Sequence, residues 1–211
     1  SMTKIKTVPV NGAIHNVYVT PDSRYAVAGS IQTRTINVID TATDEVVWEL
    51  EMDAGIRPMT FSTNADGSTK SIFVQLSGFH GFAVVDFALQ AEVARVELPA
   101  IPGQEAHYDG LQGAPAHGLG VPPDGKTVWA TSKVYSHAYV YSLPELEPVG
   151  KIFVGQHPEW ITFTPDGKTA YIGAAGDHVT YAVDVERMET VAVIPVGQVP
   201  KRVGTVLMAV D

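Results

Sequence analysis

The sequence of 211 residues contains no cysteine. Disulfide bonds, thiolate nucleophiles and cysteine-based zinc sites are therefore excluded. Secreted and cytosolic proteins can both lack cysteine, so this absence restricts the chemistry of the chain and not its location.

The sequence is also short of positive charge and of long apolar runs. It has 14 Lys and Arg against 23 Asp and Glu, a formal net charge of -9, so no overall field attracts a phosphate backbone. Its apolar runs are strand-sized, far below a membrane-spanning length. We therefore expect no nucleic-acid partner and no membrane span. Ser1-Met2 resembles the remnant of a cleaved tag, with no signal peptide ahead of it.

Several motifs of common enzyme classes are missing. The sequence has neither the Walker nor the Rossmann glycine pattern, and no strand-to-helix unit to carry one. It has no Gly-x-Ser-x-Gly elbow for a serine nucleophile and no attachment motif for c-type haem. Nucleotide cofactors and serine-nucleophile catalysis are not expected.

What the sequence does contain is an internal repeat. A turn motif built around aspartate recurs at Asp22, Asp66, Asp124 and Asp166, at intervals of 44, 58 and 42 residues. Each turn lies between two short runs of β-branched or aromatic residues, which is typical of a β-hairpin. A third run ends in a hydrophobic-Asp pair, as in Asn37 to Asp40, and a fourth run follows it. Four antiparallel strands repeated at about 40–50 residues predict propeller blades.

The fold class predicted is therefore all-β, a β-propeller of four-stranded antiparallel blades. The expected blades cover residues 15–57, 58–116, 117–156 and 157–199, with single edge strands at 4–10 and 202–209. The long interval contains an insertion loop at 99–116, a candidate lid or specificity loop. Eighteen strands match no standard closed propeller, so the chain is either a piece of a larger propeller or one of two copies that complete a ring.

The repeat resembles the YVTN family of β-propellers. The resemblance rests on Pro165-Asp166-Gly167-Lys168-Thr169, on Tyr171-Ile172-Gly173 and on the tail from Ile194 to Pro200, and it extends over nearly the whole chain. Related propellers include surface-layer proteins, lactonase-like enzymes, virginiamycin B lyase-like enzymes and the haem d1 domains of nitrite reductases. The resemblance implies a periplasmic or extracellular location, and it does not choose among these activities.

The seven histidines all fall in connections on one side of the predicted blades. His15, His117 and His157 precede the first strand of a blade, and His107 lies in the insertion. The remaining three stand between the second and third strands: His80, His137 and His178. This distribution predicts a functional face on that side, with the opposite rim of Pro-Asp-Gly turns structural.

Three kinds of site are expected on this face. His15, His117 and His157 could hold a transition metal such as zinc, copper or iron, or could instead bond to neighbouring blades and water. Acid–base catalysis would use residues among His117, His157, Glu159 and Asp109. The candidate ligand-binding residues are Arg34, Arg57, His80, His107, Tyr108, His137, His178 and Lys201.

Three functions follow from these sites. The first is a binding propeller that holds a small ligand, a metal or a protein partner on the histidine-rich face. The second is a metal-assisted lyase or lactonase-like hydrolase at the same face, which also needs an acid or base within reach. The third is a structural surface or adhesion repeat, against which the gathering of histidines argues.

Overall fold

A computed structural model describes residues 3–208 of the chain. Two expectations extend beyond this range. Ser1 and Met2, interpreted as a tag remnant, lie outside the described residues, as does position 209 at the end of the expected strand 202–209. No helix long and apolar enough to cross a membrane occurs in the part of the chain that is described.

The described chain folds into four antiparallel sheets of four strands each, which confirms the predicted fold class. Strands follow one another in sheet order within every blade. Blade 1 contains β1 (Ile14–Val19), β2 (Tyr25–Ser30), β3 (Thr35–Asp40) and β4 (Glu45–Glu51). Blade 2 contains β5 (Ile56–Thr63), β6 (Thr69–Leu76), β7 (Gly81–Asp86) and β8 (Ala91–Glu97). Blade 3 contains β9 (Ala116–Gly120), β10 (Thr127–Ser132), β11 (His137–Ser142) and β12 (Pro148–Phe153). Blade 4 contains β13 (Pro158–Phe163), β14 (Thr169–Ala174), β15 (Val179–Asp184) and β16 (Glu189–Pro195).

The repeated aspartates form the turns that join the strands. In the turn between β13 and β14, the Asp166 carboxylate accepts hydrogen bonds from the Thr164 hydroxyl at 2.6 Å and from the Lys168 amide at 3.1 Å. Asp40 and Asp184, at the ends of third strands, accept amide hydrogen bonds from the turns that follow them. Aspartate recurs here because its short side chain satisfies turn amides that have no partner in the sheet.

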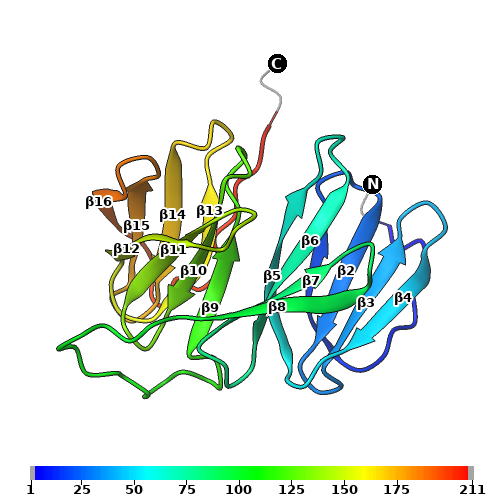
Figure 1. Cartoon of the computed structure of the whole chain (residues 1–211), viewed down its shortest axis with the longest axis horizontal. Helices are drawn as coiled ribbons and strands as arrows, with labels where there is room; N and C mark the ends of the chain where they lie inside the picture. Colours follow the sequence, from blue (N-terminus) through cyan, green and yellow to red (C-terminus); the bar gives the residue numbers. More distant parts are fainter. Residues whose placement is uncertain (1–2, 209–211) are drawn as a thin grey trace.

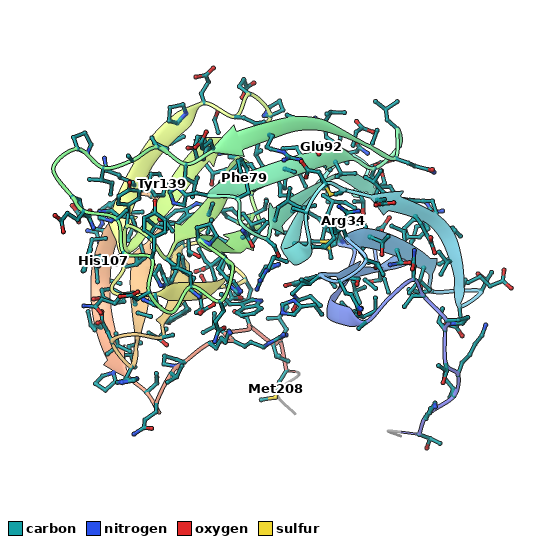
Figure 2. All side chains as sticks on the ribbon, turned by 90° about the horizontal axis from the view of Figure 1, so that it is seen from below. Arg34, Phe79, Glu92, His107, Tyr139 and Met208 are labelled. Atoms are coloured by element: carbon teal, nitrogen blue, oxygen red, sulfur yellow. The ribbon has the colours of Figure 1, made fainter. Side chains whose placement is uncertain are left out.

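Blades are held together by apolar layers between their faces. One core cluster lies between blades 1 and 2, a second between blades 2 and 3, and a third between blades 3 and 4. Fully buried Ile36 and Ile72 belong to the first layer, and Trp129 and Ile172 to the third. The innermost strands β1, β5, β9 and β13 lie beside one another in this order. Figure 1 shows the resulting row of sheets, and Figure 2 shows it as an arc.

The two ends of the chain differ from the expectation of edge strands. Residues 4–10 and 202–208 form no strand and belong to no sheet. Isolated contacts attach them instead: Lys6 donates to the Thr43 carbonyl at 3.1 Å, and the Thr205 hydroxyl donates to the Phe163 carbonyl at 2.9 Å. A strand requires a neighbour that continues the ladder of hydrogen bonds, and neither end has one here. The segment near Met208 lies on the open side of the arc (Figure 2).

Blades 3 and 4 make backbone contact at Gly118. A methyl group added to Gly118 would lie 2.0 Å from the Glu159 carbonyl oxygen, so only glycine fits. The Thr131 hydroxyl bridges the two strands, accepting from the Gly118 amide at 2.6 Å and donating to the Glu159 carbonyl at 3.0 Å. This junction fixes the spacing of β9 and β13.

We expect Gly118→Ala to lower the free energy of unfolding by about 1–3 kcal/mol or more, because the added methyl forces the two inner strands apart. Urea unfolding measures the change. Gly197→Ala is the control, since a methyl at exposed Gly197 meets no atom within 4 Å. Equal stabilities of the two variants would contradict the close contact of β9 and β13.

Candidate functional site

All seven histidines lie at the same end of the blades, the end that carries the insertion. His15 and His117 are the second residues of the inner strands β1 and β9, and His157 directly precedes β13. His107 lies in the insertion. The others stand at the second-to-third-strand connections of blades 2, 3 and 4: His80, His137 and His178. They divide into a group near the inner strands and a group that bonds locally within or between blades.

A buried charge cluster of His117, Lys133 and Glu159 lies where blades 3 and 4 meet. Each of these side chains is at most 4% exposed. The Lys133 ammonium lies 3.0 Å from Glu159 Oε1 and also donates to the Leu111 carbonyl at 3.2 Å. His117 Nδ1 lies 3.0 Å from Glu159 Oε2, but the pair is not aligned as a hydrogen bond, and neither atom has another partner among the described residues. Buried charges of this kind are costly unless paired.

Burial and charge set the protonation states of this cluster. Burial raises the pKa of Glu159, but the His117 and Lys133 nitrogens outweigh it and lower that pKa to about 2. Burial lowers the pKa of His117 below 6.5, although the neighbouring Glu159 acts in the opposite direction. We conclude that at neutral pH Glu159 is ionised and paired with Lys133, while the His117 ring is neutral.

Aromatic and cationic groups surround this cluster toward the inner strands. The His117 ring meets the Trp160 indole edge to face, with centroids 4.3 Å apart. On Trp160 lies the Arg202 guanidinium, 4.6 Å from the ring centroid, a cation–π contact. Arg202 also donates to the Asn16 side-chain oxygen at 3.0 Å, and the Asn16 amide bonds to His15. Burial lowers the pKa of His15, and the charges of Arg57, Arg202 and Lys201 lower it further.

The insertion crosses this face and is tied to three blades and to the C-terminal segment. Arg57 of β5 donates to the Gln112 carbonyl at 2.7 Å, and Lys201 donates to the Gln112 side chain at 2.7 Å. The His107 amide donates to the Val134 carbonyl of blade 3 at 3.0 Å. A methyl group on Gly110 would lie 2.8 Å from the His157 ring. Leu111 is anchored in a small apolar cluster with Val134 and Tyr135.

A cavity of about 350 Å³ lies between the insertion and blades 3 and 4; we call it the insertion cavity. Its walls are polar except for one aromatic ring. They consist of Gln104, His107, Asp109, Lys133, Ser136, Phe153, Gln156 and His157. His157 adopts a left-handed backbone conformation, with φ of 50°. Burial lowers the pKa of His157, and Lys133 lowers it further, so its ring is neutral at pH 7 and able to accept a proton.

The remaining predicted ligand-binding residues are dispersed. Arg34 lies on the outer part of blade 1 and pairs with Glu51 at 2.8 Å, both largely exposed. Tyr108 is 70% exposed. His80 bonds to the Ser132 hydroxyl at 2.8 Å, and His178 accepts from the Val199 amide at 3.0 Å. His137 bonds to the Tyr135 carbonyl. The contacts of these three histidines are structural.

The structure gives no support to a metal centre at His15, His117 and His157. Within residues 3–208, no three or more His, Asp or Glu side chains are grouped to hold a metal ion. His117 instead faces Glu159 and Trp160, His15 bonds to Asn16, and His157 lies beside Gly110. The alternative, in which these histidines bond to neighbouring blades and water, stays a prediction.

Sequence reasoning missed Lys133 and most of the cavity wall. Lys133 follows β10 in a run of residues that are all buried, Thr131 to Lys133. A lysine directly after an otherwise apolar or small-residue strand was the available signal, because burying it requires a charged partner. Gln104, Ser136 and Gln156 gave no signal, since isolated polar residues in loops are common.

We expect Glu159→Gln to flatten the acid dependence of stability. Because the pKa of Glu159 is lowered from 4.5 to about 2 on folding, its ionised form stabilises the fold above pH 4.5, and this contribution is lost as pH falls toward 2. Linkage limits it to about 3 kcal/mol. At neutral pH the variant should be less stable than the wild type, since Lys133 loses its charged partner.

Urea unfolding between pH 6 and pH 3 measures this dependence. The exposed Glu145→Gln variant is the control and should follow the wild type. If the free energy of unfolding of Glu159→Gln depends on pH as that of the wild type does, the pKa of Glu159 is not lowered on folding.

Comparison with known proteins supports the fold. No protein-family model matches the chain, and no curated protein matches its sequence. Solved structures do match. Hydrazine synthase of Kuenenia stuttgartiensis aligns with TM-score 0.70 and 19% identity, over 93% of this chain and 52% of that one. A putative 6-phosphogluconolactonase of Bacteroides fragilis aligns with a TM-score of 0.66 and 19% identity, over 88% of this chain and 55% of that one. A functionally unknown protein of Desulfotomaculum acetoxidans aligns with a TM-score of 0.71 and 15% identity, over 90% of this chain and 59% of that one. The chain thus spans little more than half the length of these proteins, and it shares with them the β-propeller fold of four-stranded blades.

Proposed function

We propose that this chain is a binding propeller that holds a small polyhydroxylated molecule, such as a sugar or sugar acid, in the insertion cavity. The observation that carries the proposal is the convergence of polar side chains from three elements on one concave space. Its volume of about 350 Å³ is within the range of small-molecule sites. A concave site of this size favours a small ligand over a protein partner.

The chemistry of the walls suits hydroxyl groups. Gln156 has a side-chain amide with no hydrogen bond to the described part of the chain, and Ser136 and His107 add further donors and acceptors. Asp109 offers an acceptor for hydroxyl protons, and Phe153 offers an apolar surface for the C–H face of a ring. The Lys133 charge is balanced by Glu159, so the cavity does not depend on a strongly charged ligand.

Gln156→Ala should weaken binding of D-gluconate and D-glucose about tenfold, since a lost hydrogen bond in a site built for hydroxyl groups leaves polar atoms unpaired. Saturation-transfer NMR titration measures the dissociation constants. Gln198→Ala, an exposed glutamine in the loop after β16, is the control and should bind as the wild type does. Absence of saturable binding of both compounds to the wild type would refute the proposal.

A second candidate is hydrolysis of a lactone in the same cavity. It is favoured by the neutral, partly buried His157, which shares the cavity wall with Asp109 and His107. The solved structure from Bacteroides fragilis is described as a putative 6-phosphogluconolactonase. In this reaction His157 takes a proton from water as the water oxygen attacks the lactone carbonyl carbon. The ring C–O bond breaks, and the proton returns to the alkoxide, which gives one hydroxy acid.

His157→Asn should then reduce turnover of D-glucono-1,5-lactone about 100-fold or more, the usual contribution of a general base. Asparagine tolerates the left-handed backbone of position 157, so the fold is retained. The proton released by the acid product is titrated at constant pH, and wild-type activity should fall as pH drops through the lowered pKa of His157. His178→Asn, also left-handed with φ of 61°, is the control. A wild-type rate equal to that of spontaneous hydrolysis would refute the lactonase function and leave ligand binding as the proposed function.

A further inference from the structure

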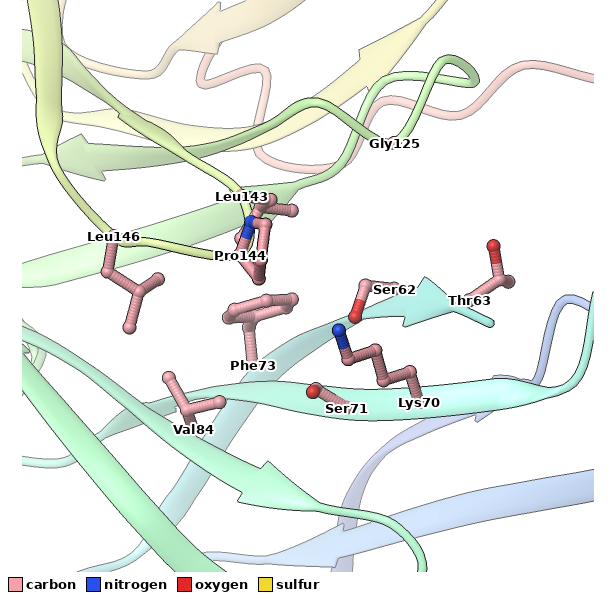
Figure 3. Close-up of a pocket in the computed structure, with 10 residues that line it drawn as sticks. All are labelled: Ser62, Thr63, Lys70, Ser71, Phe73, Val84, Gly125, Leu143, Pro144 and Leu146. Carbon is pink, nitrogen blue, oxygen red and sulfur yellow. The ribbon is translucent and has the colours of Figure 1, made fainter. Parts of the chain in front are cut away.

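A second cavity lies on the opposite rim of the molecule, in the gap between blades 2 and 3; we call it the inter-blade pocket. Its volume is about 200 Å³, and it is lined from β5, β6, β7 and the turns of blade 3 (Figure 3). The lining residues are Ser62, Thr63, Lys70, Ser71, Phe73, Val84, Gly125, Leu143, Pro144 and Leu146. None of them belongs to the histidine-rich face, so this pocket is separate from the insertion cavity.

One side of the inter-blade pocket is apolar. Phe73 and Val84 are only 2% and 6% exposed, and they belong to the core cluster between blades 2 and 3. Leu143 and Leu146 pack against the same cluster from the turn of blade 3, with Pro144 between them. In Figure 3 Pro144 lies directly over the Phe73 ring. An apolar group could therefore pack against exposed Pro144 at the edge of the existing core.

The other side carries polar groups without partners. The Lys70 ammonium lies in the pocket wall with the Ser62 and Ser71 hydroxyls, on the same side in Figure 3. Over residues 3–208, none of these three side chains forms a hydrogen bond or ion pair with another side chain or with the backbone. No carboxylate lines the pocket. One uncompensated cation beside two hydroxyl donors is suited to an anion.

The neighbouring gap, between blades 3 and 4, shows that this arrangement does not follow from the repeat. The cavity there is larger, about 510 Å³, and it contains Lys126 and Lys168 together with the carboxylates of Asp124, Asp184 and Glu186. Its lysines thus have acidic neighbours, whereas Lys70 in the inter-blade pocket has none. Both gaps follow from the repeat, but of the two only the inter-blade pocket combines an apolar side with a lysine that has no acidic neighbour in the pocket wall.

We propose that the inter-blade pocket binds a small monocyclic aromatic carboxylate. The ring lies against Pro144, which is the exposed apolar residue of the pocket wall, beside the apolar cluster that contains Phe73 and Leu143. Its carboxylate accepts from the Lys70 ammonium and from the Ser62 and Ser71 hydroxyls. An apolar cavity of about 150 Å³ accommodates benzene, so a pocket of about 200 Å³ has room for a benzene ring with one carboxylate.

The test compares three ligands of one shape, benzoate, benzamide and benzylamine, titrated into the full chain and followed by ligand-observed NMR. Benzoate should bind saturably and at least tenfold more tightly than neutral benzamide, and benzylamine should bind most weakly. Lys70→Gln should weaken benzoate binding about tenfold and leave benzamide binding unchanged, because it removes only the charge–charge attraction. Ser71→Leu should abolish binding of both, since the larger side chain fills the pocket.

Lys126→Gln is the matched control, because it removes a lysine from the equivalent rim position of blade 3 and should leave benzoate binding unchanged. Gln156→Ala should also have no effect, which separates this site from the insertion cavity. The proposal is overturned if wild-type protein does not bind benzoate saturably, if benzoate and benzamide bind equally, or if Lys126→Gln weakens benzoate as much as Lys70→Gln. Urea unfolding of Lys70→Gln verifies that this exposed substitution leaves the fold intact.

Discussion

The face-to-face packing of neighbouring blades is the constraint on which the rest of this structure depends. A four-stranded sheet with apolar residues on both faces cannot bury them alone, so each blade requires a neighbour. The apolar layers between successive blades meet this requirement and bring the innermost strands side by side. The candidate sites lie where these layers end: the insertion cavity on the histidine-rich face, the inter-blade pocket on the opposite rim, and the buried charge cluster at the junction of blades 3 and 4.

The repeat made the blades predictable because its signals are local. A turn aspartate such as Asp166 bonds to residues two positions away, so its role is readable from a short stretch of sequence. Edge strands were predicted at 4–10 and 202–209, and within the described residues this prediction was wrong, because a strand also requires a partner that continues the ladder of hydrogen bonds. Lys133 could not be assigned from its sequence neighbours, since its partners Leu111 and Glu159 come from the insertion and from another blade.

The cavities on the two rims arise from different deviations from the regular four-stranded repeat. On the histidine-rich face an insertion without strands of its own is held by Arg57, Lys201 and the Val134 carbonyl, and it encloses a space that a short connection would leave open. At the opposite rim the connections between strands are short, and the side chains that line the gaps differ from one gap to the next. A repeat architecture can thus acquire a site by adding a loop or by changing a few residues between blades.

Gly118 has a consequence for how such a chain can diversify. Because there is no room for a methyl group between Gly118 and the Glu159 carbonyl, β9 and β13 lie as close together at this point as a glycine allows. The adjacent side chains of His117 and Glu159 therefore project from a frame whose geometry is fixed independently of them. Lys133 and Glu159 are both buried and paired, so a single substitution of either one leaves the other charge without its partner. The chemistry of this junction would therefore change more readily by paired substitutions than by single ones.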